Sequence, residues 1–242
     1  MNALLFPGQG SQTVGMASEL YDNFELVKNI FSKADEKLGF SLSKIILEGP
    51  SDQLQLTKNT QPAILTVSYS IFRVLKDEFN FDFKTFKYFS GHSLGEYSAL
   101  VSSGMLNFND AIYLLHERGK AMQNAVPLGV GSMIAVLGLK VEEVKNFIDQ
   151  NKNKDEVCEI ANDNATGQVI ISGNKDYVNI IQDKLKEKKV KTIPLKVSAP
   201  FHCSLMKKAA EDMSDKINNT TFKNSIHEIV NNVQAKVEIE PD

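Results

Sequence analysis

The pentapeptide GHSLG at residues 91–95 places a serine between two glycines, and it constrains the local fold more than any other segment. Residues 85–90 before it predict a strand, and residues 94–103 predict a helix. A chain that passes directly from strand to helix here turns so tightly that side chains at the flanking positions would clash. The two glycines meet that requirement.

The alternation of strands and helices continues on both sides of this turn. Apolar residues at helical spacing predict helices, and short apolar runs bounded by turn residues predict strands. The alternation favours a large α/β subdomain with a mostly parallel sheet. The expected strands are 3–6 and 228–232, and the expected helices are 23–38, 61–79 and 110–122.

The middle of the chain follows a different plan. Strands are expected at 132–137, 157–160, 168–172 and 190–195, with helices at 141–148 and 176–188 and a polar turn at 162–167. This β-α-β-β-α-β order is the ferredoxin-like plan. We therefore expect an α/β-hydrolase-like subdomain with a parallel sheet, residues 1–128 and 196–242, and an inserted ferredoxin-like small subdomain, residues 129–195.

Composition excludes several classes of protein. The net charge of -3 gives no electrostatic attraction to nucleic acid or to anionic membranes. No apolar run approaches the ~18 residues of a membrane span, and the first residues lack the basic segment of a signal peptide. Cys158 and Cys203 are isolated, without disulfide or zinc spacing. We expect a cytoplasmic monomer that binds neither nucleic acid nor membranes.

Ser93 is the candidate nucleophile, because G-x-S-x-G between a strand and a helix is the nucleophile elbow. The turn holds the serine exposed and strained. The N-terminus of the following helix favours negative charge, which makes the backbone N–H of Leu94 the expected oxyanion donor. The alternative interpretation is a glycine-rich turn with an ordinary surface serine.

His202 is the expected base for this serine. It lies where a strand has ended and before a predicted helix at 204–217, and catalytic groups gather at such strand ends. Its order after the serine also matches elbow enzymes. Of the other histidines, His92 is expected to be structural and His116 to be a half-buried surface residue of a helix, while His227 lies near the frayed end of the chain. No convincing acid lies between the serine and this histidine, which argues against an ordinary esterase.

Several segments together resemble the malonyl-CoA:acyl carrier protein transacylases, in order and in spacing. The likeness covers essentially the whole chain. The segments are PGQGSQ at 7–12, GHSLGE at 91–96, RGKAMQ at 118–123, NDNATGQVIISG at 162–173 and SAPFH at 198–202.

The resemblance implies a role for each matching residue. Ser93 takes the malonyl group as an ester, and His202 activates first the serine and then the incoming thiol. Arg118, one of only two arginines, grips the malonyl carboxylate through a guanidinium fork. The backbone N–H of Gln9 joins that of Leu94 in the oxyanion hole. The alternatives are a solvated arginine paired with a neighbour such as Glu117, and a plain loop glutamine.

Two further positions carry weaker implications. Asn162 is expected to line the small-subdomain side of the site, although a turn-forming asparagine is the simpler interpretation. Phe201 matches a position that helps set the acyl pocket, where a bulky ring favours malonyl over methylmalonyl. Core packing explains that residue equally well.

The implied reaction has two half-reactions, with malonyl-CoA and acyl carrier protein as partners and with no metal or redox cofactor. Family members continue past the equivalent of Asp242, so we expect this chain to be truncated at its C-terminus. The segment beyond would orient the histidine through a main-chain carbonyl. Two alternatives stay open: a serine hydrolase or thioesterase of the elbow class, and an inactive, truncated remnant that binds carrier protein.

Overall fold

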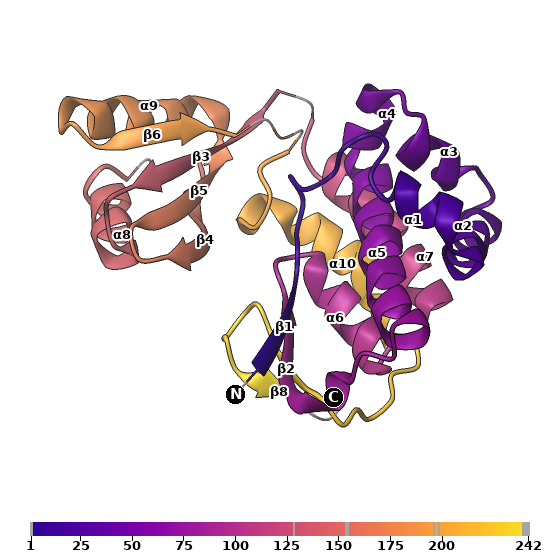
Figure 1. The fold of residues 1–242 in the computed structure, drawn as a ribbon. Coiled ribbons are helices and arrows are strands. Elements are labelled where there is room, and N and C mark those ends of the chain that lie inside the picture. Colours follow the sequence, from indigo (N-terminus) through magenta and orange to yellow (C-terminus); the bar gives the residue numbers. More distant parts are fainter. Residues whose placement is uncertain (1, 128, 153–154, 196, 198, 239–242) are drawn as a thin grey trace. The chain divides into compact units, whose positions relative to one another are not determined.

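The computed structural model describes residues 2–127, 129–152, 155–195, 197 and 199–238. The chain forms two compact units, Met1–Gly119 together with Asp215–Asp242, and Lys120–Ser214. Each unit contains its own four-stranded sheet (Figure 1). The α/β class expected from the sequence is confirmed at this level.

The sheet of the first unit is mixed. Its strands are β1 (Asn2–Phe6), β2 (Phe86–Gly91), β7 (Glu228–Val230) and β8 (Val237–Glu238), in the order β1-β2-β7-β8. β2 pairs with both β1 and β7 in parallel, as the alternation of strands and helices predicts. β8 adds an antiparallel edge that the sequence analysis missed, because two residues are too few to show a pattern.

The helices predicted in the first unit are present, with small shifts at their ends. The helices are α1 (Ser18–Asn23), α2 (Glu25–Leu38), α3 (Leu42–Leu47), α4 (Ser51–Gln55), α5 (Thr57–Arg73), α6 (Gly95–Ser103) and α7 (Phe108–Asn124), with a π-helical turn at Val74–Glu78 and a 3₁₀ turn at Phe83–Thr85. The short α1, α3 and α4 were not predicted, since five or six residues complete fewer than two helical turns. None of the helices in the described part of the chain combines the length and apolar character needed to cross a bilayer.

An aromatic core joins the first unit's sheet to its helices. α6 packs on β1 and β2, and α5 packs on α6 (Figure 1). The rings of Phe72 and Phe83 approach to 4.5 Å between centroids, and Phe72 meets Phe89 edge-on. This core holds the end of β2, and therefore the turn that follows it, on a rigid base. Its buried members are Phe6, Phe72, Phe83, Phe89, Ala99, Met105 and Ile229.

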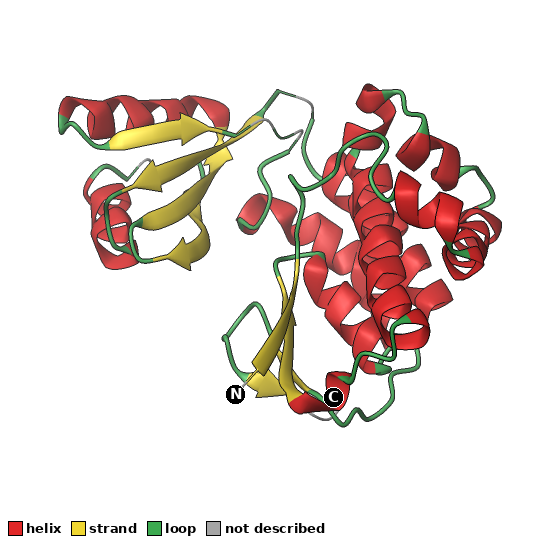
Figure 2. Cartoon of the chain, in the orientation of Figure 1, coloured by secondary structure: helices red, strands yellow, loops and turns green. Residues whose placement is uncertain are grey.

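The second unit has the predicted β-α-β-β-α-β order. Its elements are β3 (Gly131–Leu137), α8 (Val141–Gln150), β4 (Cys158–Ala165), β5 (Gln168–Asn174), α9 (Lys175–Glu187) and β6 (Lys191–Pro194). The sheet order is β4-β5-β3-β6, and every neighbouring pair is antiparallel (Figure 2). A 3₁₀ turn at Ser204–Met206 leads into α10 (Lys207–Asn218).

Both faces of this second sheet are covered. Ile134 and Val136 of β3 pack with α8 and α9 on one face. Met133 and Ala135, which alternate with them, pack on the other face with the end of α7 and the start of α10. The compact unit therefore extends beyond residues 129–195 on both sides. The limits of a ferredoxin-like subdomain within it stay a prediction.

The interpretation of residues 162–167 as a polar turn is wrong. β4 continues to Ala165, and only Thr166 and Gly167 close the hairpin, with Gly167 at a φ of +83°. Irregular register after Ile160 and after Asp163 lets the polar residues stay in the strand.

Candidate active site

The turn after β2 is as tight as the glycine spacing predicts. A Cβ placed on Gly91 would lie 2.0 Å from the carbonyl oxygen of Gly95, and one on Gly95 would lie 2.6 Å from the carbonyl oxygen of Phe6. Between them Ser93 adopts a left-handed backbone, with a φ of +52°. Such a conformation is uncommon for a residue with a side chain. The strained backbone expected at Ser93 is therefore present, but the serine is half-buried rather than exposed.

The serine stands at the start of α6. Leu94 is the residue that precedes this helix, and its side chain is buried. The carbonyl of Ser93 accepts from the N–H of Glu96 at 3.1 Å, so the first helical turn begins at the serine itself. Backbone N–H groups at such a start attract developing negative charge. The oxyanion role of Leu94 stays a prediction.

Arg118 reaches the serine from α7. Its Nη2 donates to Ser93 Oγ at 3.2 Å, and its Nη1 donates to Gln61 Oε1 on α5 at 2.8 Å. Gly119 permits this approach, since a Cβ there would lie 2.6 Å from the carbonyl oxygen of Thr57. Arg118 is thus not a solvated surface arginine, and Glu117 pairs instead with Lys216 at 3.7 Å.

The charge of Arg118 is held in a desolvated setting. Burial lowers the pKa of its guanidinium from the ordinary value, and the neighbouring Tyr97 and Glu96 oppose that shift. Burial likewise raises the pKa of the Tyr97 hydroxyl. An arginine remains protonated at neutral pH. The serine hydroxyl therefore lies beside a positive fork that is suited to a carboxylate.

Gln61 and Asn232 contact these groups and were missed by sequence reasoning. Asn232 Oδ1 accepts from the N–H of Ser93 at 3.1 Å, and its Nδ2 donates to the carbonyl of Gly91 at 2.9 Å. One signal pointed to Asn232: it ends a predicted strand, at the edge of a parallel sheet where functional groups gather. Gln61 gave no sequence signal, because it follows four polar residues at the start of α5 and its burial appears only in the structure.

Gln9 lies in the loop that follows β1. This loop lies against the elbow, because a Cβ on Gly8 would be 2.6 Å from the carbonyl oxygen of His92. The N–H of His92 also donates to the carbonyl of Phe6 at 3.1 Å. The loop is ordered by Gln12, whose Oε1 accepts from the N–H of Gly10 at 2.8 Å. These contacts bring Gln9 near the turn, and its oxyanion role stays a prediction.

Two histidines of the first unit have structural surroundings. His116 Nδ1 lies 2.9 Å from the carbonyl oxygen of Lys58. His227 is buried against the sheet, with its ring stacked 4.2 Å from that of Phe89 and its Nδ1 2.9 Å from the carbonyl oxygen of Phe86. Both imidazoles therefore have packing roles within the unit.

His202 belongs to the second unit and also has a left-handed backbone, with a φ of +59°. Phe201 before it is 6% exposed and lies in the unit's core. Asn162 is half-buried in β4, opposite Ile170. Ser198, quoted in the SAPFH motif, lies outside the described residues. Since these residues belong to the other unit from Ser93, the roles of His202, Phe201 and Asn162 stay predictions.

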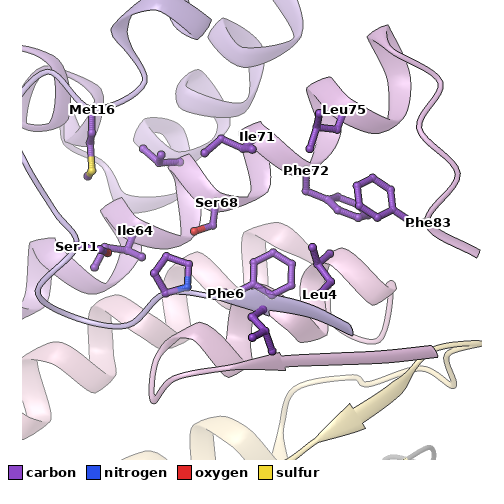
Figure 3. A pocket seen from close by; sticks show the side chains of 13 residues that line it. Leu4, Phe6, Ser11, Met16, Ile64, Ser68, Ile71, Phe72, Leu75 and Phe83 are labelled. Atoms are coloured by element: carbon purple, nitrogen blue, oxygen red, sulfur yellow. The ribbon is translucent and has the colours of Figure 1, made fainter. Parts of the chain in front are cut away.

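An apolar cavity of about 320 Å³ lies between β1 and α5 (Figure 3). Leu4 and Phe6 face it from the strand, and Ser68 and Phe72 face it from the helix. The residues described as lining it include no ionisable side chain, so it offers no base for acyl transfer. Among the described residues, no group of three or more His, Cys, Asp and Glu side chains is arranged to hold a metal ion.

Comparison with known proteins places the chain among acyltransferases. Residues 3–237 match the family described as Acyl transferase domain. The malonyl CoA-acyl carrier protein transacylase of Bacillus subtilis (strain 168) is 43% identical over 237 residues, which are 97% of this chain and 73% of that protein. The protein of the same name from Haemophilus influenzae is 44% identical, over 98% of this chain and 76% of the relative.

Solved structures agree with the sequence relatives. FabD from Acinetobacter baumannii superposes with a TM-score of 0.93 at 41% identity, covering 99% of this chain and 75% of that one. A malonyl-transacylase solved in complex with a type II PKS acyl-carrier protein gives a TM-score of 0.92 at 39% identity, covering 98% and 76%. The chain thus spans about three quarters of these relatives. It belongs to the malonyl CoA-acyl carrier protein transacylase family of acyltransferases.

Proposed function

We propose that this protein transfers the malonyl group of malonyl-CoA to the phosphopantetheine thiol of acyl carrier protein, through an ester on Ser93, for fatty acid biosynthesis. The observation that carries the proposal is the 3.2 Å contact between Arg118 Nη2 and Ser93 Oγ. A nucleophile next to a guanidinium fork suits an acyl group that ends in a carboxylate. The names of the relatives and the carrier-protein complex of one of them support the same substrates.

The first half-reaction acylates the serine. Ser93 Oγ attacks the thioester carbonyl and its proton passes to His202, while the N–H groups of Leu94 and Gln9 stabilise the oxyanion. Collapse of the tetrahedral intermediate breaks the C–S bond, and CoA leaves as a thiol with the proton from the imidazole. Arg118 holds the malonyl carboxylate during both steps.

The second half-reaction regenerates the serine. His202 takes the proton of the carrier-protein thiol, and the thiolate attacks the malonyl ester. The C–O bond then breaks, and Ser93 Oγ recovers the proton. Because one thioester replaces another, the main demand on the site is to keep water from the ester.

The finer architecture and specificity belong to the same proposal. The strand order β4-β5-β3-β6 supports a ferredoxin-like second unit, and the strand-turn-helix around Ser93 supports an α/β-hydrolase-like first unit. A substrate-binding role for Asn162, which the family resemblance implies, is part of this proposal. The bulk of Phe201 favours malonyl over methylmalonyl, although its buried position equally reflects core packing.

Intact-mass measurement after mixing with malonyl-CoA tests this function. The wild-type protein should gain one malonyl group, the Ser93→Ala variant should gain none, and holo-acyl carrier protein should then remove the group as malonyl thioester. Release of free malonate at the same rate without carrier protein would indicate a hydrolase instead. A wild-type protein that gains no mass would contradict the proposal.

A further inference from the structure

Asn232 follows β7 and uses both ends of its side-chain amide on the strained turn. Its Oδ1 accepts from the N–H of Ser93 at 3.1 Å, and its Nδ2 donates to the carbonyl of Gly91 at 2.9 Å. An N–H can only donate and a carbonyl can only accept, so these contacts fix the orientation of the amide. Asn232 thereby ties the nucleophile's backbone to the end of the strand before it.

Glu96 holds Asn232 in this position. Its Oε2 accepts from the backbone N–H of Asn232 at 2.8 Å and also from Asn232 Nδ2. Glu96 lies in the first turn of α6, where a carboxylate interacts favourably with the helix N-terminus. Hydrogen bonds to an ionised group are the stronger kind. The segment 91–96 and Asn232 therefore form a closed set of hydrogen bonds.

This set of bonds bears on the strained serine directly. A left-handed backbone at a residue with a side chain is strained and persists only where the surroundings enforce it. The bond from the Ser93 N–H to Asn232 supplies one such restraint. Because this bond already uses the N–H of Ser93, the oxyanion is stabilised by other backbone N–H groups, such as that of Leu94.

We propose that Asn232, held by Glu96, is a positioning residue that keeps the Ser93 hydroxyl aimed for attack. This inference rests on the proposed function, in which Ser93 is the nucleophile. Asn232 contacts the backbone of Ser93 and lies two residues after the end of β7. Its loss should therefore slow acylation of the serine and leave binding of malonyl-CoA largely unchanged.

The variant Asn232→Ala tests the proposal without opening the core, because Asn232 is exposed. A misplaced nucleophile should lower the single-turnover rate of malonyl-Ser93 formation about 10²-fold. The KM for malonyl-CoA should stay within about twofold of wild type. Asn231→Ala is the matched control, because Asn231 bonds within its own hairpin, to Glu238 at 2.9 Å and to the N–H of Gln234 at 2.8 Å.

Exchanging the amide and the carboxylate between positions 232 and 96 distinguishes a positioning role from a general loss of structure. Asn232→Asp removes the Nδ2 donor and sets a second carboxylate against Glu96, so it should be as slow as the alanine variant. Adding Glu96→Gln restores an amide–carboxylate contact between the two positions. The double variant should regain roughly tenfold in rate over Asn232→Asp alone, since the pair acts as a unit.

Hydrogen exchange of the Ser93 amide gives a readout independent of the reaction. The amide should exchange about tenfold or more faster in Asn232→Ala than in wild type, and Asn231→Ala should not change it. The exchange rates can be compared even if the wild-type protein takes no malonyl group. That outcome would contradict the proposed function but not the structural restraint of Ser93 by Asn232. Unchanged exchange in Asn232→Ala, an unchanged acylation rate, or an equal loss in Asn231→Ala would overturn the positioning role.

Discussion

The two residues predicted to be catalytic share one backbone feature but are held in different ways. Ser93 in the first unit has a φ of +52°, and His202 in the second unit has a φ of +59°. The N–H of Ser93 is bonded by Asn232, which lies 139 residues along the chain. The loop of His202 is held within its own unit by Glu159, whose carboxylate accepts from the N–H of Ser204 at 2.7 Å and from its hydroxyl at 2.8 Å.

The difference follows from the two sheets. Parallel strands β2 and β7 bring their carboxyl ends to one edge, so residues distant in sequence meet at the elbow. In the antiparallel second sheet, Glu159 projects from β4, a strand of one hairpin with β5. A strained residue can therefore be stabilised by a residue that is distant in sequence and follows a neighbouring parallel strand, as Ser93 is, or its loop can be held by a residue of a nearby hairpin, as that of His202 is. In both units a carboxylate takes part.

The largest effect is expected for Arg118→Ala, which removes the cation beside Ser93. Loss of the charge-assisted pair with the malonyl carboxylate should raise the activation barrier of malonyl transfer by about 3 kcal/mol, which lowers its rate roughly 10²-fold. Loading from acetyl-CoA should be spared, because acetyl has no carboxylate. Competition between the two thioesters, read by intact mass, measures the change.

Arg73→Ala is the control for this substitution. The only other arginine in the sequence bonds to Asp77 at 2.5 Å and to Tyr69 at 3.0 Å. The Arg73→Ala variant should leave the ratio of malonyl loading to acetyl loading unchanged. An equal loss of both substrates in Arg118→Ala would mean that the guanidinium serves the first unit's fold rather than substrate choice.

A smaller effect is expected for Glu159→Ala, which tests the second unit's way of holding its strained residue. The variant loses both bonds to Ser204 and should lower kcat about tenfold through a less ordered His202 loop. Ser204→Ala keeps the backbone bond and should lose less. If both variants match wild type in kcat while the Asn232→Ala variant is slow, only the first unit depends on such a restraint.

The smallest effect at neutral pH concerns Cys158, the neighbour of Glu159 in β4. Burial, with smaller contributions from Cys203 and Glu159, raises the pKa of its thiol from 9.0 to about 12. Above pH 9 the unfolded chain loses this proton while the folded protein keeps it, so rising pH favours unfolding. Stability should therefore fall by about 1.4 kcal/mol per pH unit between pH 9 and 12 from this group.

Denaturant unfolding at pH 8, 9 and 10 measures this contribution as the difference between wild type and Cys158→Ala. The variant should be less steeply dependent on pH above 9. Parallel curves for the two proteins would show that the thiol titrates in the folded state as it does in the unfolded chain.

Much of the fold followed from local patterns. Periodicity predicted the strands around Ser93, the helices that became α2, α5, α6 and α7, and the whole β-α-β-β-α-β order of the second unit. The glycines at 91 and 95 predicted a tight strand-to-helix turn. Local sterics explain Gly91, whose Cβ would meet Gly95, whereas Gly95 is also required by the close approach of Phe6 from β1. Arg118 was implied by family resemblance, and its contact with the serine agrees with that expectation.

Only the tertiary structure decided which side chains meet at the elbow. The bonds of Arg118 to Gln61 and of Ser93 to Asn232 join residues 57 and 139 positions apart. Such contacts depend on how helices and parallel strands pack, and no local spacing encodes them. The hairpin at Thr166 and Gly167 was likewise settled by pairing with β5, because cross-strand contacts kept a polar segment in the strand against its turn propensity.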